Sequence, residues 1–356
     1  MKRSTLSTLV ILLLCAAHQV LCLSKLEALK KETQGTDQST QNGLSWGSPP
    51  QQCSTSYIRN LIPPGYPFES HTVTTQDGYI LTLFRIQAKQ TSMKFGKPVV
   101  FLQHGLLNDA SAWFLNGEDK GLGFLLANAG FDVWLGNNRG CKFSRRHRTL
   151  TTADAKFWEF SFDEMAKYDL PANLAYVSAQ AGTHHIRYVG HSQGTSQMFA
   201  ALSDANTRPK VVPYVAVFYA LAPIVFLNKN RVPVVNLAAS IKGLIKTLAD
   251  RFGVKYIVPG SCVWDQAQIN YWNSKCRLNP SSCHGMVRFT DLDPNVDNWA
   301  RAGYKKEVEP SGASIDTIYK FAQLISAQAR DPNSFPKYDY GKDENLKIYG
   351  QRTPPQ

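Results

Sequence analysis

The stretch Ile186-Arg187-Tyr188-Val189-Gly190-His191-Ser192-Gln193-Gly194 is the part of the sequence that decides the fold. A short apolar run leads into a turn with a glycine on each side of a serine, and a helical pattern follows to about Ser203. Glycines at 190 and 194 let neighbouring backbone pass close to Ser192. Such a turn between a strand and a helix exposes the serine hydroxyl at the end of a sheet. The sequence therefore predicts that Ser192 is a nucleophile.

Apolar runs alternate with helical patterns on both sides of this turn. Strands are expected at 99–102, 131–135, 186–189 and 211–222, and helices at 121–129, 157–178 and 193–203. Within Phe68–Arg85, the pair Asp77-Gly78 is typical of a hairpin between two antiparallel strands. This order of elements indicates an α/β fold with a mostly parallel sheet and helices on both faces.

The start of the chain reads as a secretory signal over residues 1–22. Lys2 and Arg3 precede the apolar run Leu9–Ala17. This run is shorter than the roughly 20 residues that cross a bilayer, so a membrane anchor is disfavoured. We expect a secreted or lumenal protein with no transmembrane segment after cleavage. Residues 23–51 are then a polar leader.

The remaining chain divides into a core at 52–223, a cap inserted at 224–305 and a return to the core at 306–356. Between Val234 and Phe252, apolar residues recur at helical spacing, with Lys242, Lys246 and Asp250 on the other face. An ordinary core helix would show the same pattern. Because this stretch comes directly after a sheet strand, we favour a cap that covers the active site and excludes water.

The chain is basic, with a formal net charge of +12. A basic surface could draw the protein to anionic lipid interfaces, although a basic surface without a special partner fits equally well. Nucleic acid is disfavoured as a partner because Lys and Arg are dispersed and no binding motif is present.

Five cysteines remain once Cys15 and Cys22 are removed with the signal: Cys53, Cys141, Cys262, Cys276 and Cys283. An odd number predicts that at least one thiol is free or pairs between chains. Three of the five fall within 262–283, where we expect a local disulfide, with Cys276–Cys283 favoured. No CxxC motif or histidine pair accompanies them, so we expect no metal site and no cofactor.

A serine that attacks an acyl group needs donors for the oxyanion that forms. In a strand–turn–helix of this kind, one donor is the N–H of the next residue, here Gln193. The second comes from the loop after an earlier strand, and Leu106 in His104-Gly105-Leu106-Leu107 is our choice. We expect His104 to bridge loop backbone rather than to transfer protons.

Several stretches share the motifs of one family: His104–Leu107, Trp134–Gly140, Ser144–His147, Phe157–Met165, Tyr168–Ala172 and Gly190–Thr195, with Gly65–Pro67 and Asp77–Tyr79 before them. They resemble the acid lipases, the family of gastric and lysosomal lipases. The resemblance runs from about residue 52 to the end and is strongest before residue 225. It implies an α/β-hydrolase fold and hydrolysis of triacylglycerols or steryl esters at a lipid–water interface. Ser192 would be the nucleophile, with Leu106 and Gln193 as oxyanion donors.

A serine hydrolase of this fold also needs an acid and then a histidine after the nucleophile. His284 is the one histidine after Ser192, and it lies inside the expected cap. Neither Asp169 nor Asp339 stands where the acid is expected. We therefore assign no base and no acid in this chain.

By the resemblance, Pro310–Ser314 and Tyr338–Gly341 return the chain from the cap to the sheet. The strands with the catalytic acid and histidine are then expected just after Gln356, so the fold is expected to lack its last core strands. Either the sequence is an incomplete record of an active enzyme, or it is a truncated product that keeps only residual catalysis.

Two other functions stay open. The protein could be an esterase, thioesterase or peptidase of the same fold that acts on soluble substrates. It could also be a catalytically inactive lipid-binding protein.

Overall fold

The computed structural model describes residues 49–89, 96–229, 236, 239–257, 260, 262–283 and 297–356. The expected signal, most of the polar leader and part of the expected cap lie outside these residues. No helix among the residues described is long and apolar enough to cross a membrane.

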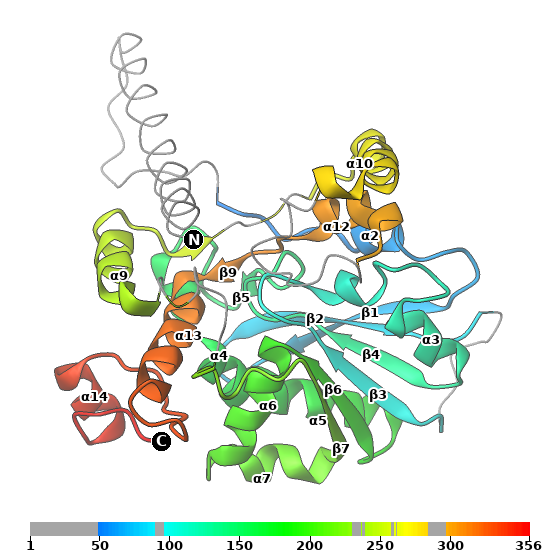
Figure 1. The fold of residues 1–356 in the computed structure, drawn as a ribbon. Coiled ribbons are helices and arrows are strands. Elements are labelled where there is room, and N and C mark those ends of the chain that lie inside the picture. Colours follow the sequence, from blue (N-terminus) through cyan, green and yellow to red (C-terminus); the bar gives the residue numbers. More distant parts are fainter. Residues whose placement is uncertain are drawn as a thin grey trace, which may run out of the picture.

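A mixed seven-stranded sheet forms the centre of the molecule (Figure 1). Its strands are β1 (Phe68–Thr74), β2 (Tyr79–Ile86), β3 (Val99–Gln103), β4 (Asp132–Gly136), β5 (Arg146–His147), β6 (Ile186–His191) and β7 (Val215–Leu221). The spatial order is β1-β2-β4-β3-β6-β7, with β5 paired to β2. Strands β4, β3, β6 and β7 are parallel, whereas β1, β2 and β5 pair antiparallel. The predicted α/β fold and the hairpin at Asp77-Gly78 are thus confirmed.

Helices cover both faces of this sheet and extend beyond it. They are α2 (Thr55–Arg59), α3 (Leu122–Asn128), α4 (Phe162–Glu164), α5 (Leu170–Ala181), α6 (Gln193–Ser203), α7 (Arg208–Val211), α9 (Lys242–Arg251), α10 (Gln266–Leu278), α12 (Ala302–Val308), α13 (Ile315–Gln328) and α14 (Lys342–Tyr349). Short 3₁₀ turns are η1 (Ala110–Trp113), η2 (Ala155–Trp158), η4 (Val212–Tyr214), η5 (Pro280–Ser282) and η7 (Trp299–Arg301). A small second sheet pairs β8 (Tyr256–Ile257) with β9 (Ala313–Ser314).

Strand β3 shows why the sheet is buried on both sides. Successive side chains of a strand point to opposite faces. Val100 and Leu102 belong to a core cluster that contains Phe124 of α3. Phe101 belongs to a second cluster that contains Leu174 of α5. A continuous apolar run with helices on each face is what a central parallel strand requires.

Two predicted boundaries were wrong. Helical structure was expected from residue 157, but a 3₁₀ turn occupies 155–158 and α4 begins only at Phe162, where Ser161 and Glu164 form a capping box. A π-helical segment, η3 (Met165–Asp169), then joins α4 to α5. Strand β7 was expected from residue 211, but it begins at Val215 because Pro213 lies in a 3₁₀ turn before it.

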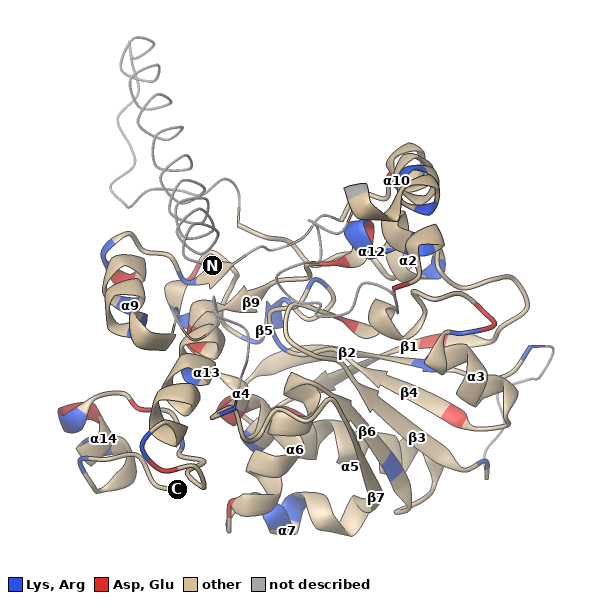
Figure 2. Cartoon of the chain, in the orientation of Figure 1, with Lys and Arg blue, Asp and Glu red and all other residues tan. Residues whose placement is uncertain are grey.

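Charged residues are spread over the helices and loops, with both signs on α9 and α14, while the central strands carry few (Figure 2). Within the part of the chain that is described, β7 is the last strand on its side of the sheet. Tyr219 and Leu221 on β7 are 50% and 40% exposed.

Two disulfides are present in the described part of the chain, one local and one between distant segments. Cys276 pairs with Cys283 as predicted, and Cys53 pairs with Cys262 across 209 residues. Cys141 is a buried free thiol, which agrees with the odd count. Disulfides are typical of secreted and lumenal proteins.

The two disulfides should differ in their effect on stability. Loop-closure entropy grows with loop length, so replacing Cys53 and Cys262 by serine should cost about 5 kcal/mol of unfolding free energy. The same change at Cys276 and Cys283, seven residues apart, should cost about 2.5 kcal/mol. Urea unfolding of the two double variants measures this. Equal costs would contradict the entropic account.

Candidate active site

Ser192 lies between the end of β6 and the first residue of α6. Its φ of 52° and ψ of −118° place it in a backbone conformation that residues other than glycine rarely adopt. Three contacts hold it there. Its N–H donates to Leu221 O of β7 at 3.0 Å, and Thr195 donates to Ser192 O through N–H at 2.9 Å and Oγ1 at 2.6 Å. Strained backbone persists where surrounding contacts fix it, and it is found at functional sites.

The two glycines of the turn are required by close backbone contacts, as the sequence predicted. A Cβ at Gly190 would lie 2.7 Å from the carbonyl carbon of Gly194. A Cβ at Gly194 would lie 2.5 Å from Gln103 O at the end of β3. Both distances are shorter than a real Cβ contact, so no side chain fits at either position.

The loop after β3 packs directly against this turn. A Cβ at Gly105 would come within 3.0 Å of Ser192 Cβ, so the backbone of this loop lies beside the serine. Leu107 in the same loop has a φ of 62°, and its carbonyl accepts the Ser311 N–H at 2.6 Å. Contacts from a distant segment therefore fix the loop that contains Leu106.

His104 has the structural role that the sequence predicted. Its Nδ1 lies 2.8 Å from Gly105 O, and its Nε2 accepts the Asn138 N–H at 3.0 Å. This arrangement requires the neutral ring with the proton on Nδ1. Burial lowers the pKa of His104 to about 4. The ring therefore stays neutral at ordinary pH and joins two loops at the end of the sheet.

Three buried amide side chains, of Gln103, Asn138 and Gln197, form a hydrogen-bonded group. Asn138 Oδ1 accepts from Gln103 Nε2 at 3.0 Å and from Gln197 Nε2 at 2.7 Å. Asn138 also holds His104 through its backbone N–H. One residue thus connects β3, the loop after β4 and helix α6. Asn138 therefore helps to fix the segments that hold the Ser192 turn.

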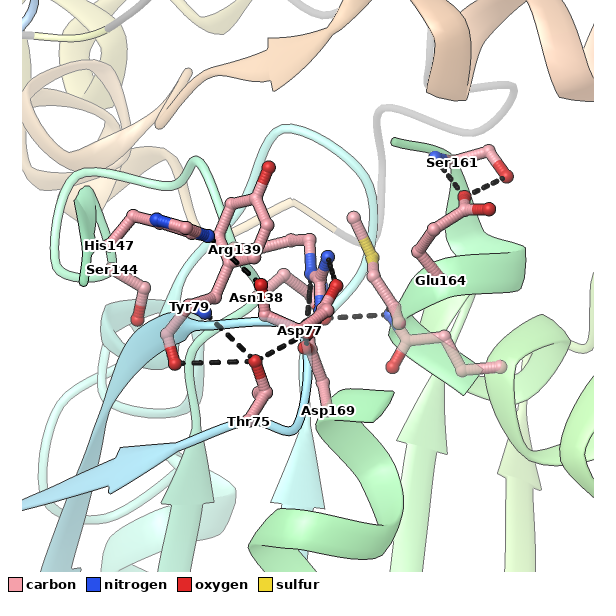
Figure 3. A network of polar contacts seen from close by, with 12 residues as sticks. Thr75, Asp77, Tyr79, Asn138, Arg139, Ser144, His147, Ser161, Glu164 and Asp169 are labelled. Atoms are coloured by element: carbon pink, nitrogen blue, oxygen red, sulfur yellow. Dashed lines mark hydrogen bonds and ion pairs between the residues drawn. The ribbon is translucent and has the colours of Figure 1, made fainter. Parts of the chain in front are cut away.

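Arg139, the next residue, holds that loop in place by two ion pairs, a buried one to Asp169 and a partly buried one to Asp77 (Figure 3). Its guanidinium donates to Asp77 Oδ2 at 2.7 Å and to Asp169 Oδ1 through Nε at 3.0 Å. The carbon of the guanidinium lies 3.9 Å from the centre of the Tyr79 ring. Three segments of the chain, the β1–β2 hairpin, the loop after β4 and the start of α5, therefore meet at one side chain.

In the cluster of Asp77, Arg139 and Asp169, burial and ion pairing shift the pKa values in opposite directions. Burial raises the pKa of Asp169 to about 6, although Arg139 opposes that shift. Burial would also raise the pKa of Asp77, but the hydrogen bonds from Arg139 lower it below its ordinary value. Burial disfavours the charge on Arg139, yet the two carboxylates raise its pKa. The cluster stays ionised at neutral pH because each charge has a partner.

Asp169 and Asp339 are both engaged in structural contacts. Asp169 pairs with Arg139, and Asp339 Oδ1 accepts from Gly341 N and Asn345 Nδ2. Neither residue was predicted to be catalytic. The Arg139 cluster was not predicted either, although Arg139 follows a buried strand and stands beside Asn137, Asn138 and Gly140, a pattern that could have suggested a buried charge.

The rings of four histidines contact residues other than Ser192: His71 contacts Tyr176, His104 contacts Gly105, His147 contacts Asp77 and His184 contacts Ser178. His191 packs its ring edge-on near Trp113, 6.4 Å between centroids, and burial lowers its pKa. His284 lies outside the described residues.

Glu309, near the loop that contains Leu107, should affect the stability of the fold in a pH-dependent way. Burial raises its pKa from 4.5 to about 7. Because the folded pKa exceeds the unfolded one, the charged side chain destabilises the fold as pH rises from about 4.5 to 7. We expect Glu309→Gln to be more stable than the parent by roughly 1–2 kcal/mol at pH 7.5 and nearly equal at pH 4.5. Urea unfolding at both pH values checks this, and a pH-independent difference would contradict it.

Comparison with known proteins places the chain in a family. Residues 55–117 match the partial α/β-hydrolase lipase region, and residues 98–235 match the α/β hydrolase fold. The chain is 38% identical to a lysosomal acid lipase/cholesteryl ester hydrolase of Macaca fascicularis over 82% of this chain and 71% of that protein. It is 37% identical to a gastric triacylglycerol lipase of Mus musculus, with the same shares covered. The chain therefore belongs to the acid lipase family, carboxylic ester hydrolases of the α/β-hydrolase fold.

Proposed function

We propose that this protein hydrolyses triacylglycerols or steryl esters through an acyl-enzyme intermediate on Ser192. The observation that supports this most is the backbone at Ser192, which is held at positive φ between β6 and α6. That conformation is typical of a nucleophile turn, and the Ser192 Cβ lies beside the Gly105 loop. A nucleophile in such a turn can reach an ester carbonyl that lies on the loops at the end of the strands.

Two backbone N–H groups are proposed as oxyanion donors. Gln193 is the first residue of α6, and N–H groups in the first turn of a helix have no acceptor within that helix. Leu106 follows Gly105, whose backbone lies against Ser192. The positive end of the α6 dipole would add to the stabilisation of a developing oxyanion.

The acid and base of the triad are left unassigned. In the described part of the chain, the ring contacts of His71, His104, His147 and His184 are all with residues other than Ser192. The proposal therefore concerns the nucleophile and its oxyanion donors, and it leaves the proton acceptor to experiment.

The substrate class rests on relatives and on the expected cap. The relatives are named for triacylglycerol and cholesteryl ester hydrolysis. Helix α9, within the proposed cap at 224–305, exposes Leu244 and Leu248, which suit contact with a lipid–water interface. We further propose that residues 1–22 direct the chain to the secretory route, which agrees with its two disulfides.

A fluorophosphonate probe tests the nucleophile on the protein purified from its natural source. We expect mass spectrometry to find the adduct on Ser192 and not on Ser196, which lies one helical turn away in α6. Ser192→Ala should abolish labelling and reduce ester hydrolysis by about 10³-fold or more. Ser196→Ala is the matched control and should keep both.

Ester chain length tests the substrate class. Faster hydrolysis of long-chain triacylglycerol or steryl esters than of short-chain soluble esters is expected. A strict preference for short chains would reject the lipase proposal in favour of a soluble-substrate esterase. Absence of labelling in a folded sample would reject catalysis and favour a lipid-binding protein.

A further inference from the structure

An open cavity of about 480 Å³ is lined by residues of α9, α13, the start of α4 and the segment before α14. These elements lie on the same side of the molecule in Figure 1. Its volume falls in the range of small-molecule sites, roughly 300–1,000 Å³. None of the residues assigned to the Ser192 turn or its oxyanion donors lines it. The cavity is therefore a candidate for a second site.

Three tyrosines form the aromatic wall of this cavity: Tyr319, Tyr338 and Tyr340. The ring centres of Tyr338 and Tyr340 are 4.7 Å apart, and those of Tyr319 and Tyr338 are 6.0 Å apart. Carboxylates orient two of the hydroxyls. Tyr338 donates to Asp316 at 2.9 Å and Tyr340 donates to Glu164 at 3.3 Å. The rings are thus held as a fixed wall.

The lining carries more negative than positive charge. Five carboxylates line the cavity against the two ammonium groups of Lys246 and Lys255. Both lysines are already paired with Asp250, at 2.7 Å and 3.4 Å. Of the five carboxylates, Glu159 and Asp339 form no ion pair with these two lysines. A cavity of tyrosine rings and excess carboxylate favours a cationic ligand.

The type of cation follows from the geometry. A metal ion needs several oxygens that converge on one point, and no group of three or more His, Cys, Asp or Glu side chains in the described chain could hold one. A quaternary ammonium group donates no hydrogen bonds and is recognised by aromatic ring faces with negative charge nearby. We propose that this cavity binds a quaternary ammonium group, as found in choline.

Two sources could supply this group, free phosphocholine and the head of a choline phospholipid. Helix α9 contributes Lys246 and Asp250 to the cavity and exposes Leu244 and Leu248, which are 59% and 44% accessible. These leucines lie on the opposite face of α9 from Lys246 and Asp250, so vesicle binding, and not their exposure, distinguishes the two sources. Ser192 takes no part, so the proposal does not depend on catalysis.

Ligand-observed NMR on the purified chain tests the site. We expect tetramethylammonium and phosphocholine to bind at least about fivefold more tightly than ammonium and phosphoethanolamine. Tyr340→Leu should weaken binding of phosphocholine by about fivefold, whereas Tyr340→Phe, which keeps the ring, should change it by less than about twofold. Glu159→Gln should weaken it by about twofold, and Asp119→Asn, outside the cavity, should leave it unchanged.

Several results would overturn the proposal. The first is equal binding of ammonium and tetramethylammonium. The second is no binding of phosphocholine at about 50 mM, which is about the weakest affinity of a specific site. The third is unchanged affinity for phosphocholine in both Tyr340→Leu and Glu159→Gln, with circular dichroism spectra like that of the parent. Co-sedimentation with phosphatidylcholine vesicles, reduced by Tyr340→Leu, assigns the lipid head group as ligand. Binding of phosphocholine without vesicle binding assigns the soluble form. Ser192→Ala should bind like the parent, so failure of this site and failure of the proposed catalysis are distinguishable.

Discussion

Arg139→Met is expected to lower the free energy of unfolding by about 3–5 kcal/mol at neutral pH. Arg139 is 2% exposed, and its guanidinium pairs with both Asp77 and Asp169. Removing it leaves two carboxylates without their cation, one of them buried, and that costs more than the ion pairs themselves contribute. Urea unfolding at pH 7 gives the value directly.

The unfolding free energy lost in Arg139→Met should increase as pH rises. Without Arg139, the folded pKa of Asp169 would rise further above about 6, while its unfolded value stays near 3.8. A raised folded pKa destabilises the charged form, so the penalty grows as pH rises through this range. We expect Arg139→Met to be closer to the parent at pH 5 than at pH 8.

Two controls separate the buried pairs from a general effect of charge. Arg146→Met removes an exposed arginine with one long contact, 3.4 Å to Thr72 Oγ1, and should cost less than about 0.5 kcal/mol. Arg139→Met combined with Asp77→Asn and Asp169→Asn should recover part of the loss because no uncompensated charge remains. A triple variant less stable than the single one would contradict this explanation.

Gly194→Ala is expected to destabilise the protein by about 1–3 kcal/mol and to slow probe labelling of Ser192 by about tenfold or more. The added methyl would stand 2.5 Å from Gln103 O, which is backbone and cannot rotate away. Either β3 or the turn must therefore move, and Ser192 moves with the turn. Thermal unfolding and labelling rates measure the two effects.

Whether Gly194→Ala stabilises or destabilises the protein is informative because Gly194 lies within helix α6. Alanine is the better helix former by about 1 kcal/mol, so without the close contact the substitution would stabilise. Gly243→Ala in α9 is the matched control, since nothing lies within 4 Å of its added Cβ. It should be neutral or stabilising. A stabilised Gly194→Ala with normal labelling would show that the close contact is not needed.

Local patterns in the sequence were sufficient for the strand–turn–helix at Ser192. Helix α6 spans Gln193–Ser203 as expected, and β6 begins at Ile186. Both follow from short-range information, namely an apolar run, two glycines and helical spacing. The structural role of His104 could also be inferred, since a histidine in a tight loop after a buried strand has backbone groups within reach.

Contacts between distant residues could not be read in the same way. Arg139 meets Asp77 and Asp169, which are 62 and 30 residues away, and no local pattern announces either partner. Residue periodicity also failed at 157–161, where a capping box at Ser161 starts the helix later than the apolar spacing suggests. The cavity wall is assembled from three separate stretches, around residues 159–164, 246–255 and 316–341.

The sequence by itself determined the α/β class, the turn that presents Ser192, the local disulfide Cys276–Cys283 and, through its motifs, the family. Each depends on residues close together in the chain. Only the tertiary structure decided the Cys53–Cys262 link, the ion pairs of Arg139 and the tyrosine-lined cavity. These depend on which distant segments the packed sheet and helices bring together, and that choice is made by burial across the whole core.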